Sequence, residues 1–441
     1  MRSPVRALRV ERANAMVSHH MGAPLSAHVT PPVRRGAAPP HGRCGDVTPT
    51  CIILPATTTR RSSTGGQVQR TRATFTPSDL EVVPAVNALL GELGVGRLRT
   101  EDVESLFGRN ENWAGTTDAG VGVFVKRVST DGGPQDADRR VARTRSFAAL
   151  VAGHASPDLA TPELIGHDRD SRVLVFRLLA DARTFAELAA DDGLDEDLAR
   201  RAGRATGLLH GLDTTQARPP LEGSPFPFPD LGLLRSLPLG GFMGLTFAEV
   251  TLWRILHGDA QLIEALAALR AAEEKAPRVP THCDLRFDQF LLADGVLHLT
   301  DGEEFRRSDA ARDIGSMAGE WLYRAVTGLT GRDTRDDADT LTVREPTHAE
   351  IIARGVAEMD RARPLISAFW SGYRSARPDG DPELAARATA FAGWHMIDRA
   401  MATAARGSRL PAVTRAAMGI GRTALLAPRD FVGALGLEER R

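Results

Sequence analysis

The sequence predicts an α+β protein with a small β-rich N-lobe over residues 77–179 and a larger helical C-lobe over residues 180–441, preceded by a tail over residues 1–76. Short runs of β-branched and aromatic residues, such as residues 123–128, mark the first lobe. Apolar residues at helical spacing, as in residues 197–212, dominate the second lobe. A chain of 441 residues exceeds one average domain and accommodates both lobes.

The composition excludes several classes of function. With 55 basic and 56 acidic residues, the net charge of −1 gives no electrostatic case for binding nucleic acid or an anionic membrane. No uninterrupted apolar run approaches the ~18 residues of a membrane span. The three cysteines, Cys44, Cys51 and Cys283, have no metal-type spacing and argue against a disulfide framework. We therefore expect a cytoplasmic protein whose partners include neither nucleic acid nor a membrane.

The tail differs in composition from the rest of the chain. Residues 1–76 are rich in Pro, Gly, Ser, Thr and Arg, and their only acidic residues are Glu11 and Asp46. Such a segment cannot bury enough apolar surface to offset its ordering entropy, so we expect it to be disordered. An overlong start to the reading frame and an Arg-rich targeting segment are the alternatives.

Residues 281–302 carry the strongest functional signal. A polar turn contains Asp284, and Gln289 follows five residues later, just before an apolar strand. The dipeptide Asp294-Gly295 indicates a hairpin turn, because it tolerates the positive φ of tight reversals. A second alternating strand ends at Asp301. This spacing predicts that two carboxylates and an amide converge at one end of a hairpin.

The turn His282-Cys283-Asp284-Leu285-Arg286-Phe287-Asp288-Gln289 resembles the protein-kinase catalytic loop His-x-Asp-Leu-x-x-x-Asn. It looks closest to the aminoglycoside-phosphotransferase branch, in which a small residue follows the histidine. The resemblance implies a bilobal, protein-kinase-like fold that binds ATP and Mg²⁺ between its lobes and transfers the γ-phosphoryl group to a hydroxyl. An Asp-rich hairpin that arose by chance is the alternative interpretation.

The resemblance also implies roles for individual residues. Asp284 would be the catalytic base, and His282 of the same loop is a further candidate catalytic residue. Arg286 is placed to meet the charge of the transferring phosphoryl group, much as kinases use a lysine. Asp301 and Gln289 would bind Mg²⁺. Gln289 departs from the family's Asn: it keeps the carbonyl oxygen but adds a methylene group.

The N-lobe supplies candidate phosphate-binding groups. Lys126 lies in the strand at residues 123–128, where kinases keep the lysine that pairs the α- and β-phosphates. A compact ammonium suits that task better than a planar guanidinium, although a solvent-facing edge lysine is the alternative. The preceding loop over residues 107–117 lacks the Gly-x-Gly-x-x-Gly spacing. Its candidate nucleotide-binding residues are Asn110, Asn112, Gly115 and Thr116.

Two further segments bear on the resemblance. A helix expected over residues 139–152 contains no Glu to pair with Lys126, and Asp136 or Asp138 near its start are candidate substitutes. Residues 306–315 resemble the phosphotransferase segment Gly-Asp-Pro-x-x-Asp-Leu-Ala, which would open a helix and tie Asp313 to the catalytic loop. A simple helix N-cap at residue 308 or 309 is the alternative.

A narrower resemblance concerns the acceptor. The patterns Asn-x-Asn-Trp-Ala-Gly-x-Thr at residues 110–117 and Asp-Leu-Arg-x-Asp-Gln-Phe-Leu at residues 284–291 look like the kinase subunits of class V lanthionine synthetases. This implies phosphorylation of Ser/Thr hydroxyls in a precursor peptide, with a separate lyase as partner. A small molecule such as an aminoglycoside is the other candidate acceptor. Glu303, Glu304 and Glu320 would either line an acidic pocket for a cationic sugar or face solvent.

A second class of function remains open. The missing helix glutamate, Gln289 at the metal position and the irregular phosphate loop favour a pseudokinase, a nucleotide- or peptide-binding module without turnover. The presence of Lys126, Asp284 and Asp301 together favours the enzyme.

Overall fold

The computed structural model of the chain describes residues 74–75, 77–106, 109–154, 156–215, 217, 220–330, 348–378 and 381–438. The expected tail, apart from Thr74–Phe75, lies outside this part of the chain, as do Cys44, Cys51 and the charged segment at residues 333–345.

A six-stranded antiparallel sheet forms the N-terminal part, with the strand order β1-β2-β3-β4-β6-β5. Its strands are β1 (Thr74–Phe75), β2 (Val103–Leu106), β3 (Glu111–Thr116), β4 (Gly122–Arg127), β5 (Leu164–Asp168) and β6 (Val173–Arg177). Because Thr74 and Phe75 pair with Leu106 and Ser105, the boundary expected at residue 76 falls after the first strand instead of before it.

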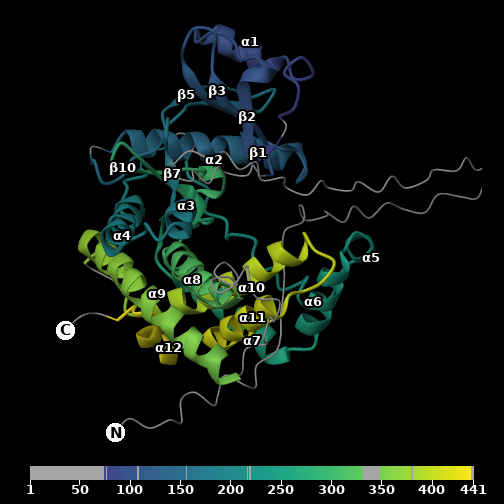
Figure 1. The fold of residues 1–441 in the computed structure, drawn as a ribbon, viewed down its shortest axis with the longest axis vertical. Coiled ribbons are helices and arrows are strands. Elements are labelled where there is room, and N and C mark those ends of the chain that lie inside the picture. Colours follow the sequence, from purple (N-terminus) through teal and green to yellow (C-terminus); the bar gives the residue numbers. More distant parts are fainter. Residues whose placement is uncertain are drawn as a thin grey trace, which may run out of the picture.

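Two helices enclose this sheet (Figure 1). Helix α1 (Ala85–Glu92) covers one face, where Val86, Leu90 and the fully buried Trp113 form a core. Helix α2 (Pro134–Ala152) lies on the other side and packs Val141 against Leu174. Helix α2 begins five residues before the expected start at residue 139, because proline is well tolerated in the first turn of a helix.

The expected hairpin is present in the structure. Strands β9 (Phe290–Ala293) and β10 (Val296–Leu299) pair in antiparallel register around Asp294 and Gly295, whose φ angles are +49° and +75°. A short strand, β7 (Arg183–Thr184), extends this sheet, and β8 (Arg278–Thr281) pairs with β11 (Arg306–Asp309). The turn that contains Asp284 therefore lies between β8 and β9.

Helices dominate the rest of the described chain (Figure 1). They are α3 (Phe185–Ala190), α4 (Glu196–His210), α5 (Leu239–Phe242), α6 (Phe247–His257), α7 (Ala260–Lys275), α8 (Ala311–Thr327), α9 (His348–Ala376), α10 (Leu384–Ala404), α11 (Ala412–Leu426) and α12 (Pro428–Leu435). One apolar core, built on residues such as Leu209, Met317, Phe369 and Ile397, holds these helices together, apart from α5, which has no buried residue.

Two separate helices precede β8 in the chain. Helix α6 ends at His257, and Asp259 starts α7 by accepting the backbone N–H of Leu262 at 3.1 Å. Among the described helices, none is long and apolar enough to cross a membrane.

Candidate active site

Asp313 fixes the turn that presents Asp284. In the first turn of α8, its buried carboxylate accepts the backbone N–H groups of His282 and Cys283 at 2.7 and 2.8 Å. Cys283 has a φ of +67°, a left-handed conformation that a non-glycine residue adopts at a cost, so these two bonds hold the turn in an unfavourable shape. The tie between Asp313 and the turn, which the sequence resemblance implied, is therefore present.

Asp313 is itself supported from the helical core. His210 of α4 lies 3.0 Å from Asp313 through Nε2, and its other ring nitrogen lies 3.2 Å from the hydroxyl of Tyr373. Burial alone would raise the pKa of Asp313, but His210, His282 and the backbone hydrogen bonds lower it below its usual value. Asp313 thus stays ionised and keeps both oxygens available as acceptors.

His282 lies inside the protein instead of facing an open cleft. It is fully buried, its Nε2 lies 2.7 Å from the carbonyl oxygen of Thr300, and its ring meets that of Phe147 edge-on. This bond joins the turn before β9 to the end of β10. We therefore regard His282 as a positioning residue and not, as the sequence suggested, a catalytic one.

Asp284 is partly exposed on this turn, and Arg286 beside it is mostly buried. The carboxylate of Asp284 is 35% exposed, and the Arg286 guanidinium lies 3.3 Å from both Asp284 and Asp288. Burial alone would lower the pKa of Arg286, but Asp284 and Asp288 raise it. Among the described residues, the buried Nε of Arg286 has no acceptor, and an oxygen of an anionic ligand would satisfy it.

Gln289 lies in the chain between Asp284 and Asp301, and its side chain is buried. Its backbone carbonyl accepts the N–H of Thr300 at 2.9 Å, and its Oε1 lies 3.4 Å from the Thr300 hydroxyl. The amide therefore faces the end of β10, next to Asp301. This places a carbonyl oxygen close to the last residue of the hairpin.

Asp301 and Lys126 join the hairpin to the large sheet. Lys126 on β4 donates to Asp301 Oδ1 at 2.6 Å and also forms an ion pair with Glu303. Burial alone would lower the pKa of Lys126, but the two carboxylates raise it above its usual value. Lys126 is therefore held as a cation with its ammonium in the site, and it is not an edge lysine that faces solvent.

The partner of Lys126 does not come from α2. Asp136 lies beside Arg139 at 3.3 Å, and Asp138 forms an ion pair with Arg172 at 2.8 Å. The expectation that either aspartate replaces the missing helix glutamate is therefore wrong. Glu303, in the short 3₁₀ helix η4 (Gly302–Glu304), contacts Lys126 instead.

The three glutamates considered for an acidic pocket are all paired. Glu303 contacts Lys126 and Arg140, and Glu304 forms ion pairs with Arg143 at 3.1 Å and Arg306 at 2.7 Å. Glu320 lies 2.6 Å from His395. Their charges are balanced by neighbouring groups, so they neither face solvent nor form an unpaired acidic pocket.

The two asparagines of the expected phosphate loop already have partners within the protein. Asn110 donates to Glu303 at 2.6 Å and accepts from Arg140 and from the backbone of Ser129. Asn112 binds both backbone groups of Leu106, at 2.7 and 2.9 Å, and so closes the end of the β2–β3 hairpin. Residues 107 and 108 between these strands lie outside the described part of the chain.

Gly115 and Thr116 are not part of a loop. Both lie in β3, where Gly115 pairs with Val103 and Val123, and Thr116 pairs with Gly122. Lys126 pairs with Asn112 at the other end of the same strands. The loop is therefore shorter than the sequence suggested and ends at Asn110, because residues 111–116 form ladder hydrogen bonds.

The residues fit a Mg²⁺ site that is completed by a ligand. Among the described residues, no group of three or more His, Cys, Asp or Glu side chains could hold a metal ion. The 31%-exposed carboxylate of Asp301 and the amide oxygen of Gln289 are hard oxygen donors. Because Mg²⁺ is typically held by one or two protein groups together with phosphate oxygens and water, this donor set suits Mg²⁺ bound with a nucleotide.

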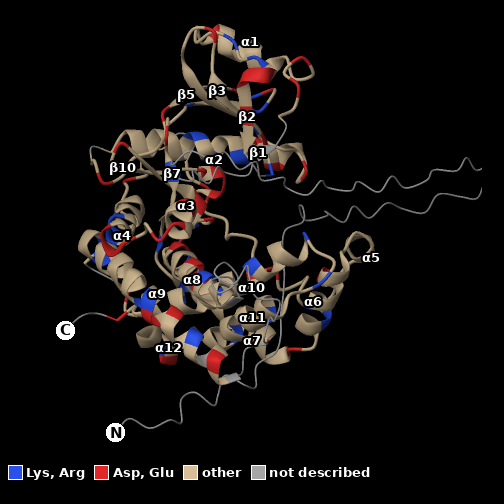
Figure 2. Cartoon of the chain, in the orientation of Figure 1, with Lys and Arg blue, Asp and Glu red and all other residues tan. Residues whose placement is uncertain are grey.

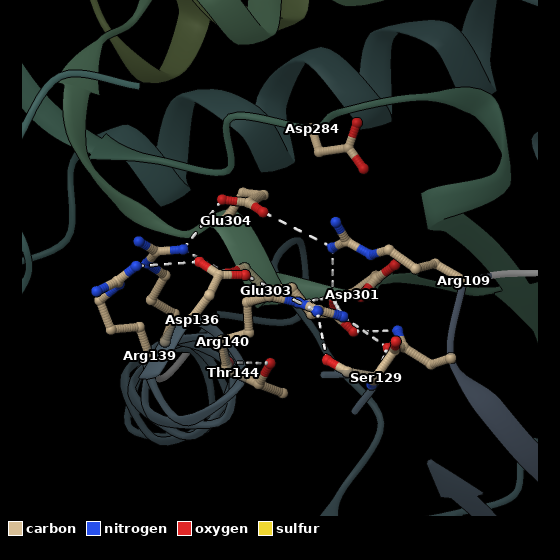
Figure 3. A network of polar contacts seen from close by, with 12 residues as sticks. Arg109, Ser129, Asp136, Arg139, Arg140, Thr144, Asp284, Asp301, Glu303 and Glu304 are labelled. Atoms are coloured by element: carbon tan, nitrogen blue, oxygen red, sulfur yellow. Dashed lines mark hydrogen bonds and ion pairs between the residues drawn. The ribbon is translucent and has the colours of Figure 1, made fainter. Parts of the chain in front are cut away.

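Arg140 and Arg109 belong to the site although the sequence did not indicate them, and Glu303 has a different role from the one expected. Glu303 contacts Lys126, Arg140 and Arg109, and Asp284 stands across from Arg109 (Figure 3). Arg109 lies 3.1 Å from Glu303. The available signals were the Arg at residue 140, which lies next to the apolar Val141, and a Glu two residues after Asp301.

Comparisons with known proteins give a likeness of fold. No family model matches the chain, and no curated protein matches it. The solved structure of an amicoumacin kinase aligns over 79% of this chain and 96% of its own, with a TM-score of 0.48 and 14% identity. A microcompartment-associated aminopropanol kinase aligns over 81% and 99%, with a TM-score of 0.47 and 16% identity.

A macrolide 2'-phosphotransferase from Brachybacterium faecium aligns over 82% of this chain and 100% of its own, with a TM-score of 0.41 and 18% identity. All three similar structures are kinases or phosphotransferases of small molecules. Because the TM-scores lie below 0.5, this likeness assigns neither a family nor a substrate to the chain.

Proposed function

We propose that this protein is an ATP- and Mg²⁺-dependent phosphotransferase that moves the γ-phosphoryl group of ATP to a hydroxyl acceptor. One observation carries the proposal: Lys126 on β4 lies 2.6 Å from Asp301, at the end of the hairpin that follows the Asp284 turn. A strand lysine, a metal-binding carboxylate and a general base are the parts that phosphoryl transfer requires.

Each residue would contribute positioning or charge. Lys126 would exchange its contact with Asp301 for the α- and β-phosphates. Asp301 and Gln289 would hold Mg²⁺, which neutralises charge on the phosphates. Asp284 would orient the acceptor hydroxyl and take its proton. Arg286, 3.3 Å from Asp284, would stabilise charge on the transferring group.

Among acceptors, we favour the Ser/Thr hydroxyl of a peptide over a cationic sugar such as an aminoglycoside. The sugar would require unpaired carboxylates, and Glu303, Glu304 and Glu320 are all paired with basic groups. Removal of the phosphate from a modified Ser or Thr would need a lyase as partner. A phosphorylated peptide and a phosphorylated sugar can be told apart in the same phosphate-transfer assay.

A binding module without turnover is the second candidate. The observation that favours it is that Asn110 and Asn112 use their side chains inside the protein, where a phosphate loop would offer free donors. Such a module would bind nucleotide through Lys126 without transferring phosphate.

Transfer of radiolabelled phosphate from ATP separates these functions. We expect labelling of Ser/Thr peptides or aminocyclitols above the background of ATP hydrolysis in the wild type. We expect both signals to fall in Asp284→Asn, while Asp294→Asn, in the exposed hairpin turn, serves as the matched control. Equal labelling and hydrolysis in the wild type and Asp284→Asn would leave only the binding module.

A further inference from the structure

We propose that Glu303, in the turn after the metal-binding position, is the residue that positions Lys126 for the nucleotide phosphates. It takes the place of a helix carboxylate, and Arg140 of α2 holds it there. The inference rests on the proposed phosphotransferase function. It adds a positioning residue that the catalytic-loop motif does not contain.

Glu303 is held from several directions. Its Oε1 contacts Lys126 and accepts the side-chain amide of Asn110 at 2.6 Å. Its Oε2 accepts from Arg140 Nε at 2.9 Å and from Arg109 at 3.1 Å. Only 6% of its side chain is exposed. Since both oxygens already have donors, Glu303 is a fixed partner for the ammonium and not a free metal ligand.

Asp301 is a looser partner of Lys126. Its side chain is 31% exposed, and Lys126 is its hydrogen-bond partner among the described residues. A bound cation can therefore take the Asp301 carboxylate without breaking other contacts. Glu303 then remains as the anion beside Lys126, because Arg140, Arg109 and Asn110 keep it in place.

In the kinase arrangement the helix provides the carboxylate, whereas here α2 carries the positive charge and the turn carries the negative one. Arg140 is 1% exposed and also donates to the backbone of Ser129 at 3.0 Å. The helix therefore provides a buried cation, and the turn provides the anion. Figure 2 shows basic residues along α2 beside acidic residues of the neighbouring segment.

Close packing keeps α2 and the turn together. A Cβ atom at Gly302 would clash with the ring of Phe147 on α2, so the residue between Asp301 and Glu303 has to be glycine for this approach. Phe147 also packs edge-on against Phe305, just after the turn. This contact fixes the distance between Arg140 and Glu303 independently of their charges.

The chain offers a direct test, because Lys126 and Lys275 are its only lysines. Protein labelled with ¹³C at lysine Cε should give two side-chain signals, and the exposed Lys275 is an internal reference for a mobile lysine. Relaxation at constant pH, without nucleotide or metal, then reports how rigidly the Lys126 side chain is held. Lys126→Arg assigns the signals.

We expect Lys126 to be ordered in the wild type and in Asp301→Asn, and to become mobile in Glu303→Gln. The matched control is Glu304→Gln, in the next residue of the same turn, which pairs with Arg143 and Arg306 and should leave Lys126 ordered. If Glu303→Gln does not fold, Glu303→Asp, which withdraws the carboxylate by one methylene, should show the same loss of order. Mobility in Asp301→Asn but not in Glu303→Gln would overturn the proposal, as would equal mobility in Glu303→Gln and Glu304→Gln.

A second measurement tests whether Glu303 supports nucleotide binding. Affinity for Mg·ADP should fall about tenfold or more in Glu303→Gln and stay within about twofold in Glu304→Gln, the scale of a lost contact to a charged group. An unchanged affinity in Glu303→Gln would overturn the positioning role. The relaxation experiment needs no phosphoryl transfer, so its outcome stands even if no acceptor is ever labelled.

Discussion

Lys126 and Asp301 are 175 residues apart in the chain, and their side chains meet at 2.6 Å. This ion pair closes the space between β4 of the large sheet and the end of the β9–β10 hairpin. On the proposed function, a nucleotide phosphate would have to compete with Asp301 for the same ammonium. The free protein therefore keeps the lysine charged and in place before any ligand arrives.

The first prediction concerns nucleotide binding by Lys126. Lys126→Met keeps the apolar stem but removes the ammonium, so Mg·ATP should bind more weakly and the ATP-induced thermal shift should disappear. Lys275→Met, at the exposed end of α7, is the matched control. Differential scanning fluorimetry with and without Mg·ATP measures the effect. A thermal shift equal to that of the wild type would remove Lys126 from the nucleotide site.

The second prediction concerns the proposed base. Asp284→Asn keeps the shape of the turn but cannot accept a proton, so kcat should fall by ~10²–10⁴-fold, the typical contribution of general-base assistance. Nucleotide affinity should stay close to that of the wild type, because in the proposed mechanism Asp284 would contact the acceptor and not the nucleotide. Steady-state kinetics measure kcat, and calorimetry measures nucleotide affinity. A parallel loss of nucleotide binding would point to a collapsed turn instead of a lost base.

The third prediction concerns the length of the Gln289 side chain, which we propose as a Mg²⁺ ligand. Gln289 is buried, with its amide oxygen 3.4 Å from the Thr300 hydroxyl, so the site is built around the longer side chain. Gln289→Asn should therefore raise the Mg²⁺ concentration needed for half-maximal activity by several-fold. A magnesium titration at saturating ATP measures this. Higher activity in the variant would instead indicate that Gln289 is a degraded position.

The fourth prediction concerns the anchor of the catalytic turn. Asp313→Asn would direct an amide N–H₂ group at the N–H of either His282 or Cys283, where the wild type has two acceptors. The free energy of unfolding should fall by about 3 kcal/mol, and activity should fall with it. Urea denaturation measures the stability, with Asp430→Asn, in the exposed first turn of α12, as the control. Unchanged stability would show that the turn keeps its conformation without the Asp313 carboxylate.

The fifth prediction concerns acid stability. Burial alone would raise the pKa of Glu320, but His395, Arg399 and Arg286 lower it from 4.5 to about 2. Because the folded-state pKa lies below the unfolded one, the carboxylate stabilises the fold above about pH 4.5 and loses this effect as pH falls toward 2. The contribution is about 3 kcal/mol.

Glu320→Gln tests this pH dependence. Its deficit in unfolding free energy relative to the wild type should be constant at neutral pH and shrink below about pH 4.5. Urea titrations at several pH values measure the difference, and Glu274→Gln, exposed on α7, should show no such trend. A deficit that does not change with pH would indicate a packing effect instead.

The sequence predicted those parts of the site that are local in the chain. Asp284, Gln289, Asp294-Gly295 and Asp301 lie within one hairpin, so turn chemistry and strand periodicity were enough to place them. The tie between Asp313 and the turn was also predicted, because a sequence motif resembled it. The α+β composition followed from the same local patterns.

Tertiary structure decided which charges meet. Glu303 rather than an aspartate of α2 pairs with Lys126, and Asn110 and Asn112 bind within the protein. Gly115 belongs to a strand because of its pairing with Val103 and Val123. These facts depend on contacts between distant segments, and the attraction between two charges is set by their separation and burial, which the order of residues does not contain.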